Sequence, residues 1–419
     1  MTRRRVAGGM ASGMAFGVSH FAARVAARLL ARVGVALAAL VLPAATFAQA
    51  KPVLVGAAIA QTGYLADLAA ATQKALELWR DDVNARGGLL GRPVELKLYD
   101  DSSDALRSTE LYEKLVTVDH ADLLVGSFGS AATSMAAAVA ERSRRVMVNA
   151  TGASPEIHRR VYRYLFQVPP PADTTAAGVL PLAAKAGLTQ VAVIARDEGS
   201  ARTLVEQLRR DAPKLGAVIR PTQLYVTDSR LGFAPFAKLL APTAPGVVVS
   251  PANIYDTADL VRGFKAAGFT PKLFITPGVA QPGFTKRIGQ DAEYAVGFSS
   301  YEPLAATPGN AAFAKAYRTR YKAAPDFYAA CGWAAGGVIE AAVARAGSLE
   351  QEKLRAAFAA VEVPTVLGGY KVAPDGSQVA ATAFLVQILR GRREVIWPEA
   401  HRSATPVIPA PEWNRRKPL

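Results

Sequence analysis

Cysteine and histidine, which are typical of zinc sites and of nucleophilic catalysis, are few in this sequence. The 419 residues include one cysteine, Cys331, and four scattered histidines, His20, His120, His158 and His401. One cysteine excludes an intramolecular disulfide and a cysteine zinc cluster, and no two histidines have the i,i+4 spacing of a helical zinc site. We therefore expect no metal ion.

Catalytic and cofactor-binding motifs are also missing from the sequence. It contains no GxSxG nucleophile elbow, no phosphate-binding loop ending in GK[ST], and no GxGxxG after a strand. No histidine lies near a candidate nucleophile. We predict a protein that is not an enzyme and that needs no cofactor.

Ser130 has surroundings suited to a carboxylate ligand. It opens the run Ser130-Ala131-Ala132-Thr133 at the predicted start of a helix, where a hydroxyl and the backbone N–H groups that follow face outward. These unpaired donors and the helix dipole favour an anion. The other interpretation is an ordinary N-cap serine, and capping and ligand binding can coexist.

The secondary-structure elements predicted around Ser130 alternate between strands and helices along the chain. Strands rich in Val, Ile and Leu are followed by amphipathic stretches of helical length, the pattern of parallel sheets with helices on both faces. The first set comprises strands 53–59, 94–99, 123–125 and 146–148 with helices 65–84, 104–118 and 131–142. The second comprises strands 191–195, 222–226, 247–249 and 273–276 with helices 201–208, 233–240 and 257–267, followed by helices 312–321 and 331–346.

Chain length and the run Pro169-Pro170-Pro171 both indicate two lobes. A chain of 419 residues exceeds one ordinary domain, and three prolines after strand 164–168 predict a crossover between units. We expect an α/β fold of two doubly wound parallel-sheet lobes. Such folds bind ligands at the carboxyl ends of their strands, so the site belongs in the cleft between the lobes.

Residues 1–50 have the pattern of a secretory signal peptide. A basic stretch ending at Arg32 precedes the apolar run 33–42, and Ala48-Gln49-Ala50 provides small residues for cleavage. The apolar run is too short to span a membrane, and we expect no later stretch to be long and apolar enough to span one. We expect a periplasmic mature protein that begins near Lys51 and has no transmembrane segment.

The net charge of +15 does not indicate a nucleic-acid partner. Six arginines and no acidic residue lie in the first fifty residues, and the other basic residues are spread along the chain. No nucleic-acid-binding motif accompanies them, so we expect no binding of nucleic acid.

One motif resembles that of a known family. The run DVNARGGLLGRPVEL at 82–96, followed by Asp100-Asp101, is similar to the branched-chain amino-acid-binding family of type I periplasmic binding proteins. We interpret its glycines as structural, because they follow a helix and suit its C-cap. The similarity continues in the same order to about Ile396. It implies lobe one at 51–170 and 301–380, lobe two at 171–300 and 381–397, and a C-terminal tail at 398–419.

The resemblance implies a substrate-binding component of an ABC transporter, which delivers amino acids or other small organic acids to a permease in the inner membrane. It places the ligand's α-carboxylate and α-amine at lobe-one loops. Asn253, Tyr255, Phe327 and Tyr328 lie in loops or at the start of a helix near the expected cleft. They could supply amide hydrogen bonds and an aromatic wall, although Phe327 and Tyr328 could instead belong to the core. The predicted ligand-binding residues are Ser130, Thr151, Ala153, Ser200, Asn253, Tyr255, Phe327 and Tyr328.

The sequence departs from the family pattern at three positions. Ala153 replaces a threonine, and the loops at Ser200 and Pro277 lack the aromatic residue and the acid that contact an amino-acid ligand. A buried ammonium group without a counter-charge is costly, so the ligand either lacks one or finds its partner elsewhere. We predict a small carboxylate recognised more through its acid group than through an α-amine. A ligand-sensing module for a membrane receptor is the alternative function, because both roles use lobe closure.

Overall fold

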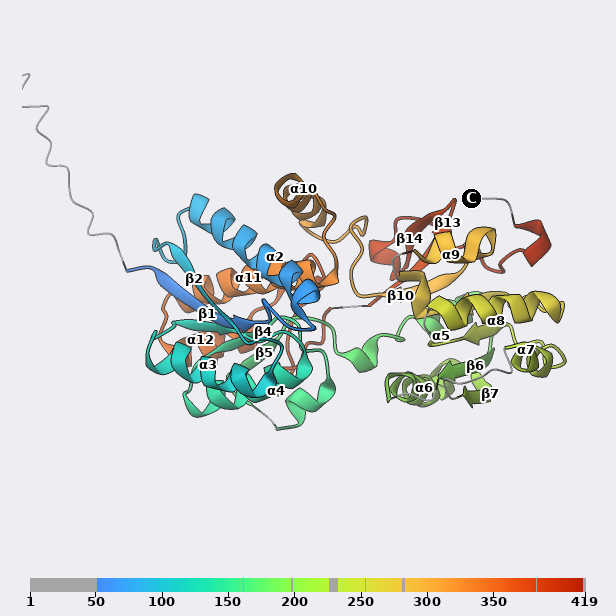
Figure 1. The fold of residues 1–419 in the computed structure, drawn as a ribbon, viewed down its shortest axis with the longest axis horizontal. Coiled ribbons are helices and arrows are strands. Elements are labelled where there is room, and N and C mark those ends of the chain that lie inside the picture. The colour runs from blue at the N-terminus through green and yellow to red at the C-terminus, as the bar shows by residue number, and fades with distance from the viewer. Residues whose placement is uncertain are drawn as a thin grey trace, which may run out of the picture. The chain divides into compact units, whose positions relative to one another are not determined.

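The first five strands form a parallel sheet in which β1 lies between β2 and β3. The computed structural model describes residues 51–160, 162–196, 199–225, 233–252, 254–280, 283–381 and 383–416. In this sheet the order is β2-β1-β3-β4-β5, and Figure 1 labels β1, β2, β4 and β5. The strands are β1 Val53–Ile59, β2 Val94–Asp100, β3 Leu123–Val125, β4 Met147–Asn149 and β5 Leu165–Gln167.

Helices cover both faces of this sheet and complete lobe one. They are α2 Ala66–Ala85, α3 Ala105–Thr117, α4 Ser130–Arg142, α10 Asn310–Tyr321, α11 Phe327–Ala346 and α12 Gln351–Ala360. Successive side chains of a strand point to opposite faces. Val53, Val55 and Ile59 of β1 therefore pack in one buried cluster with α2, α11 and α12. Ala58 packs on the other face with α3 and α4.

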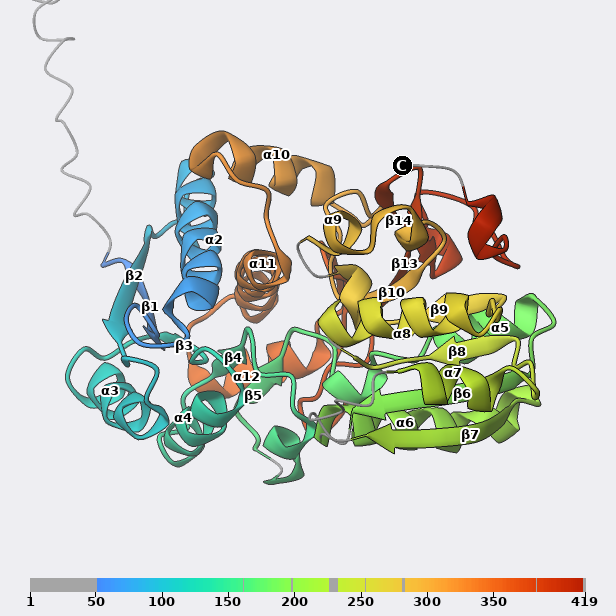
Figure 2. The ribbon, with the colours of Figure 1, turned by 45° about the vertical axis from the view of Figure 1, so that its right-hand side comes forward.

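Helices α2 and α11 pack closely together on the first of these faces (Figure 2). A Cβ atom at Gly336 would lie 2.2 Å from the Trp79 ring, so glycine is what permits the close approach. In the described part of the chain, α11 is the one helix with the length and apolarity of a membrane span. The expectation that no later stretch meets this criterion was wrong, and the burial of α11 against α2 and β1 accounts for its composition.

The second sheet has seven strands in the order β14-β13-β10-β9-β8-β6-β7. They are β6 Gln190–Arg196, β7 Val218–Tyr225, β8 Val247–Val249, β9 Leu273–Ile275, β10 Val296–Ser299, β13 Phe384–Leu389 and β14 Arg392–Trp397. Strands β13 and β14 pair antiparallel and the others parallel. On one face lie α5 Val179–Lys185 and α6 Gly199–Asp211, and on the other α7 Ala234–Leu240, α8 Ile254–Ala266 and α9 Phe284–Ile288. This is lobe two.

The described chain passes between the sheets after β5, after β10, and after a hairpin formed by β11 Val363–Thr365 and β12 Gly368–Tyr370. The predicted α/β fold of two lobes with parallel sheets is confirmed, with the addition of the antiparallel strands β13 and β14. Strand β7 begins earlier than predicted and contains Pro221, which its position at the edge of the sheet tolerates.

Residues of the expected C-terminal tail pack onto lobe two. Trp413 is buried, and its indole N–H donates to the Phe269 carbonyl over 2.9 Å. The Arg416 guanidinium stacks on the Trp413 ring at 3.6 Å and donates to the Glu293 carbonyl over 2.8 Å. Residues up to Arg416 are thus part of the folded lobe.

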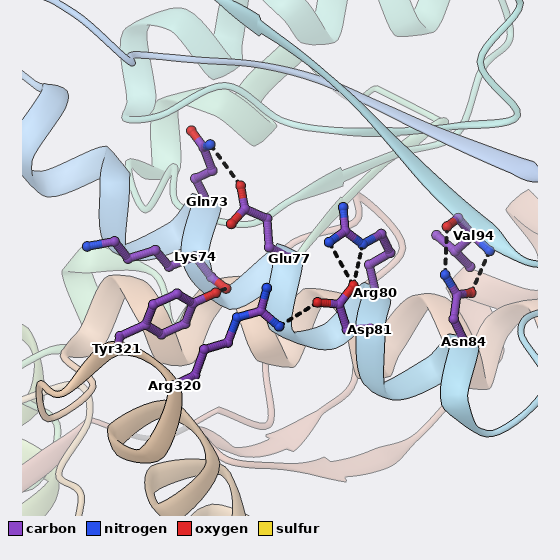
Figure 3. A network of polar contacts seen from close by, with 9 residues as sticks. All are labelled: Gln73, Lys74, Glu77, Arg80, Asp81, Asn84, Val94, Arg320 and Tyr321. Atoms are coloured by element: carbon purple, nitrogen blue, oxygen red, sulfur yellow. Dashed lines mark hydrogen bonds and ion pairs between the residues drawn. The ribbon is translucent and has the colours of Figure 1, made fainter.

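The family motif has the structural role expected of it. The Asn84 side chain at the end of α2 donates to the Val94 carbonyl over 2.9 Å and accepts from the Val94 N–H over 2.7 Å (Figure 3). Gly88 has a φ of +77°, and a Cβ atom there would lie 2.0 Å from the Arg92 carbonyl oxygen. Only glycine fits this turn between α2 and β2.

A polar network joins α2 to α10 on the outside of lobe one (Figure 3). The Asp81 carboxylate pairs with Arg80 on its own helix and with Arg320 of α10. The Tyr321 hydroxyl donates to the Lys74 carbonyl over 2.7 Å, and the Lys74 ammonium lies over the Tyr321 ring. These contacts hold α10, which follows the second crossover, against α2.

Candidate functional site

Ser130 is the first residue of α4 and does not cap it. The N-cap is Gly129, with a φ of +85°, and no side chain makes a capping hydrogen bond. The N-cap interpretation of Ser130 was therefore wrong. Its Oγ instead accepts from the Ser154 N–H over 3.2 Å, which joins the start of α4 to the loop after β4.

Thr151 and Ala153, which belong to this loop, connect it to neighbouring segments by hydrogen bonds. Thr151 Oγ1 accepts from the Gly129 N–H over 3.0 Å and donates to the Ser127 carbonyl over 3.1 Å. Thr151 is buried. The Ala153 carbonyl accepts from the Ala172 N–H over 2.8 Å, which connects the loop to the first crossover.

A small pocket of about 170 Å³ lies at the N-terminus of α4. Its lining is Tyr64, Leu65, Asp101, Ser103, Ala105, Phe128, Gly129, Ser130, Ala131 and Ala132. The Tyr64 side chain is exposed, whereas Asp101 is buried. Both oxygens of Asp101 accept hydrogen bonds from the protein, from the Ser127 hydroxyl over 2.6 Å and from the Ser103 N–H over 3.0 Å.

A larger cavity of about 800 Å³ is lined by residues of both lobes. Lobe one contributes Leu68 of α2 and, from the start of α11, Phe327 and Tyr328, both half-buried. Lobe two contributes residues that include Phe284 of α9 and Arg393 of β14. The Tyr328 ring contacts Phe128, a wall of the small pocket, with ring centroids 4.8 Å apart. The two cavities therefore adjoin at this aromatic pair.

The larger cavity contains a buried acid that the sequence did not indicate. Glu302, in the crossover after β10, is only 5% exposed. The Arg393 guanidinium lies 3.5 Å from its carboxylate and also donates to the Ala280 carbonyl over 2.7 Å. Burial raises the pKa of the Glu302 carboxyl, although Arg393 and a hydrogen bond with Ser299 act in the opposite direction.

The remaining predicted residues belong to lobe two. Ser200 is the second residue of α6, and Asn253 lies outside the described residues. Tyr255 is exposed, and the Arg287 guanidinium stacks on its ring at 4.0 Å. Tyr255 is not among the residues that line the two cavities. The structure thus brings Phe327 and Tyr328 to the larger cavity and Ser130 to the smaller one.

The polar side chains that line the two cavities are not arranged as a metal centre. Among the described residues, no group of three His, Cys, Asp or Glu side chains is arranged to hold a metal ion. The site offers hydrogen-bond donors, an aromatic wall and a buried carboxylate paired with a partly exposed arginine, which suit recognition of a small polar molecule with an apolar body.

Residues 52–393 match the model of the family described as periplasmic binding protein. The Leu/Ile/Val-binding protein homolog 8 of Brucella abortus is 24% identical over 387 residues, which cover 88% of this chain and 94% of that protein. A structure described as a branched-chain amino acid ABC transporter from Rhodospirillum rubrum is similar, with a TM-score of 0.76 and 23% identity over 83% of this chain and all of that one.

A solute-binding protein of an ABC transporter from R. palustris, solved in complex with benzoate, is also similar. It has a TM-score of 0.62 and 21% identity, and the match covers 86% of this chain and 99% of that one. The family match spans most of the chain, so this chain belongs to the periplasmic binding protein family, as the motif at 82–96 predicted.

Proposed function

We propose that this chain is the extracytoplasmic solute-binding component of an ABC importer. It captures a small carboxylate-bearing metabolite, an amino acid or a related organic acid, and delivers it to a permease in the inner membrane. The observation that carries this proposal is the position of the α4 N-terminus, which lies at a pocket beside the cavity between the two lobes.

The carboxylate binds at the start of α4. The first N–H groups of a helix have no partner within it, and the dipole of a 13-residue helix favours negative charge at this end. The Ser130 hydroxyl adds a donor. Asp101 opposes an anion, but its two oxygens are already engaged by Ser127 and Ser103, which spreads its charge over neighbouring donors.

The apolar part of the ligand lies in the larger cavity. Its volume of about 800 Å³ is within the range of roughly 300–1,000 Å³ usual for small-molecule sites. Phe327, Tyr328 and Phe284 supply aromatic surface, and such surface favours a branched or aromatic body.

The names of the similar proteins support the same class of ligand. One relative is named for leucine, isoleucine and valine, and one similar structure holds benzoate. These molecules share a carboxylate on an apolar body, and benzoate has no amine. A carboxylate is therefore the group on which we base the proposal.

A direct test compares acids with their neutral amides by calorimetry. The pairs are leucine with leucinamide and benzoate with benzamide, titrated into the protein lacking residues 1–50. We expect at least one acid to bind and to exceed its amide by about tenfold or more, because a charge-assisted hydrogen bond contributes roughly 1.5–3 kcal/mol. The proposal would be contradicted if an acid and its amide bound equally well. It would also be contradicted if no acid bound, neither these two nor any in a wider panel of small carboxylates.

A further inference from the structure

Lobe two carries almost all of the positive charge of the chain after residue 50. Residues 171–300 and 381–419 contain 21 Lys and Arg residues and 13 Asp and Glu residues, a net charge of +8. Residues 51–170 and 301–380 contain 22 and 21, a net charge of +1. Both lobes are sheets covered by helices, so the architecture does not by itself require this excess.

Cations gather at the edge of the lobe-two sheet where its parallel strands begin. Strands β7, β8 and β9 follow the helices α6, α7 and α8, so each helix ends at the edge where the next strand starts. The ligand cleft belongs at the other edge, beyond the carboxyl ends of the strands. Six exposed cations lie in the last helical turns and the connections at this edge, which we call the basic edge: Arg209, Arg210, Lys214, Lys238, Lys265 and Lys272.

Acidic residues neutralise only part of the basic edge. Asp211 pairs with Lys214 at 2.9 Å and lies 3.6 Å from Arg210, and Asp291 pairs with Lys265 at 2.8 Å. Within the described part of the chain, no ion pair involves the other three cations of the edge, Arg209, Lys238 and Lys272. These three charges are therefore exposed to solvent and available to a partner.

The helix dipole accounts for where these cations lie but not for their excess. Lys and Arg are favoured in the last turn of a helix, because the helix C-terminus carries partial negative charge. Lobe one has the same feature at Lys114 and Arg142, but Arg142 pairs with Glu113 and the charges of that lobe nearly balance. The surplus in lobe two therefore indicates a partner with negative charge.

Exposed aliphatic side chains stand among the cations of the basic edge. Leu215, next to Lys214, is 37% exposed, and Leu239, next to Lys238, is 45% exposed. Lys214 lines a pocket of about 220 Å³ that none of the other five cations lines, so the charges do not converge on one small anion. Lys and Arg interleaved with exposed leucines are typical of surfaces that bind the headgroup region of anionic membranes.

We propose that lobe two docks on an anionic lipid surface through the basic edge. The cations face the lipid phosphates, and Leu215 and Leu239 enter the boundary between headgroups and acyl chains. The cleft at the opposite ends of the strands stays open to solvent, so a ligand can enter and leave while the protein is held at the membrane. This docking does not depend on which ligand the cleft takes.

The test is co-sedimentation of the chain from Lys51 to Leu419 with lipid vesicles. One set of vesicles is phosphatidylcholine alone, and the other is phosphatidylcholine with one third phosphatidylglycerol. The triple variant Arg209→Gln/Lys238→Gln/Lys272→Gln is compared with the control Arg107→Gln/Lys315→Gln/Lys353→Gln, which removes the same charge from exposed positions of lobe one. A third variant is Leu215→Ser/Leu239→Ser. Thermal melting checks that each variant folds.

The wild type should bind the vesicles that contain phosphatidylglycerol and leave the neutral vesicles in the absence of that lipid. About 0.5 M NaCl should release most of it, because salt at this level shortens the Debye length to less than about 5 Å. The lobe-two triple variant should bind about tenfold more weakly or less, since each Lys or Arg near an anionic surface contributes about fivefold. The lobe-one control should stay within about twofold of the wild type, and the leucine variant should bind several-fold more weakly.

The contrary outcomes identify what is wrong. Equal binding of the two triple variants would show that net charge alone acts and that the basic edge is not the docking surface. Absence of binding to the anionic vesicles, or equal binding to the neutral ones, would overturn the proposal. Soluble poly-L-glutamate is the probe for an acidic protein: if the wild type binds it through the same three cations and ignores the vesicles, the partner is a protein and not a membrane. Wild-type binding by the leucine variant would also overturn the assignment to a membrane.

Discussion

Ser130 combines a hydroxyl, a helix N-terminus and a cavity wall in one position. Its hydroxyl oxygen already accepts from the Ser154 N–H, so its hydrogen is available to donate to a ligand oxygen. This arrangement differs from N-capping, in which the hydroxyl would serve the helix itself. Ser130 can therefore contribute to binding without being required for the stability of α4.

Replacement of Ser130 by alanine should weaken binding of a small carboxylate by about 0.5–3 kcal/mol, the contribution of one hydrogen bond to a charged group. The thermal midpoint should change little, because no capping hydrogen bond is lost. Calorimetry with the tightest acid of the panel measures the effect. Ser134→Ala, one turn further along α4 and outside the pocket lining, is the control. Equal affinity in the wild type and in Ser130→Ala would remove Ser130 from the site.

At the residue scale, only positions with a local or family signal could be proposed from the sequence. Ser130 was expected at a helix start and at the family's serine position, and Phe327 and Tyr328 at a helix start near the expected cleft, with a core role as the alternative; their contact with a ligand stays a prediction. Glu302 could not be predicted, because its burial depends on contacts with Arg393 and Ser299 that come together only in the folded protein. A single acid in the run Phe298-Ser299-Ser300-Tyr301-Glu302 has no local signal of that kind.

Among the secondary-structure elements, the contact between α2 and α10 should contribute to stability in a pH-dependent way, through the Asp81 carboxyl. Burial tends to raise the pKa of the Asp81 carboxyl, but hydrogen bonds from Arg320 and Arg80 outweigh it, so the pKa lies below its ordinary value. A carboxyl with a lowered pKa stabilises the fold above its unfolded pKa of about 3.9. That contribution is lost as pH falls through the lower pKa of the folded state.

Asp81→Asn should therefore lower the thermal midpoint at pH 7 by a few degrees at most. The pair is solvent-exposed, and exposed ion pairs contribute less than about 1 kcal/mol. The difference from the wild type should shrink as the pH falls below about 4. Melting curves at pH 7 and at pH 3 measure it, with the exposed acid Glu110 changed to Gln as control. A difference that is larger at pH 3 than at pH 7 would show that Asp81 acts in another way.

Element type was predictable where hydrophobic periodicity was strong. Strands β1, β3 and β8 have the predicted bounds, because short runs of Val, Leu and Ile between turns leave little choice. Strand β10 was missed because Gly297 and Ser299 interrupt its apolar pattern, and Gly297 is required where the Val279 side chain approaches within 2.4 Å of a Cβ position. Strands β13 and β14 join the sheet from far along the chain, which local pattern does not reveal.

At the scale of the whole molecule, the proposed role requires export. Residues 1–50 lie outside the described residues, and their basic, apolar and small-residue pattern is the basis for a cleaved leader. Expression of the full sequence in a Gram-negative host should yield a periplasmic protein whose first residue lies near Lys51. Amino-terminal sequencing of the periplasmic fraction measures this. A protein that stays in the cytoplasm with its first fifty residues attached would contradict the prediction.

The two lobes share a cavity and are connected by the chain after β5, β10 and β12. Crossovers of this kind act as hinges, because a few residues between packed elements absorb the change in backbone angles. A ligand whose carboxylate binds at α4 and whose body contacts both lobes would favour the closed arrangement over the open one. We therefore expect the lobes to close when the ligand binds. This closure can be measured without knowing which residues contact the ligand.

Small-angle X-ray scattering of the protein lacking residues 1–50, with and without a saturating carboxylate identified by calorimetry, tests carboxylate capture between the lobes most directly. The radius of gyration should fall when the acid is added and should not change with the matched amide. An unchanged radius of gyration alongside saturable binding of the acid would place the ligand outside the cavity between the lobes, and capture by lobe closure would be wrong.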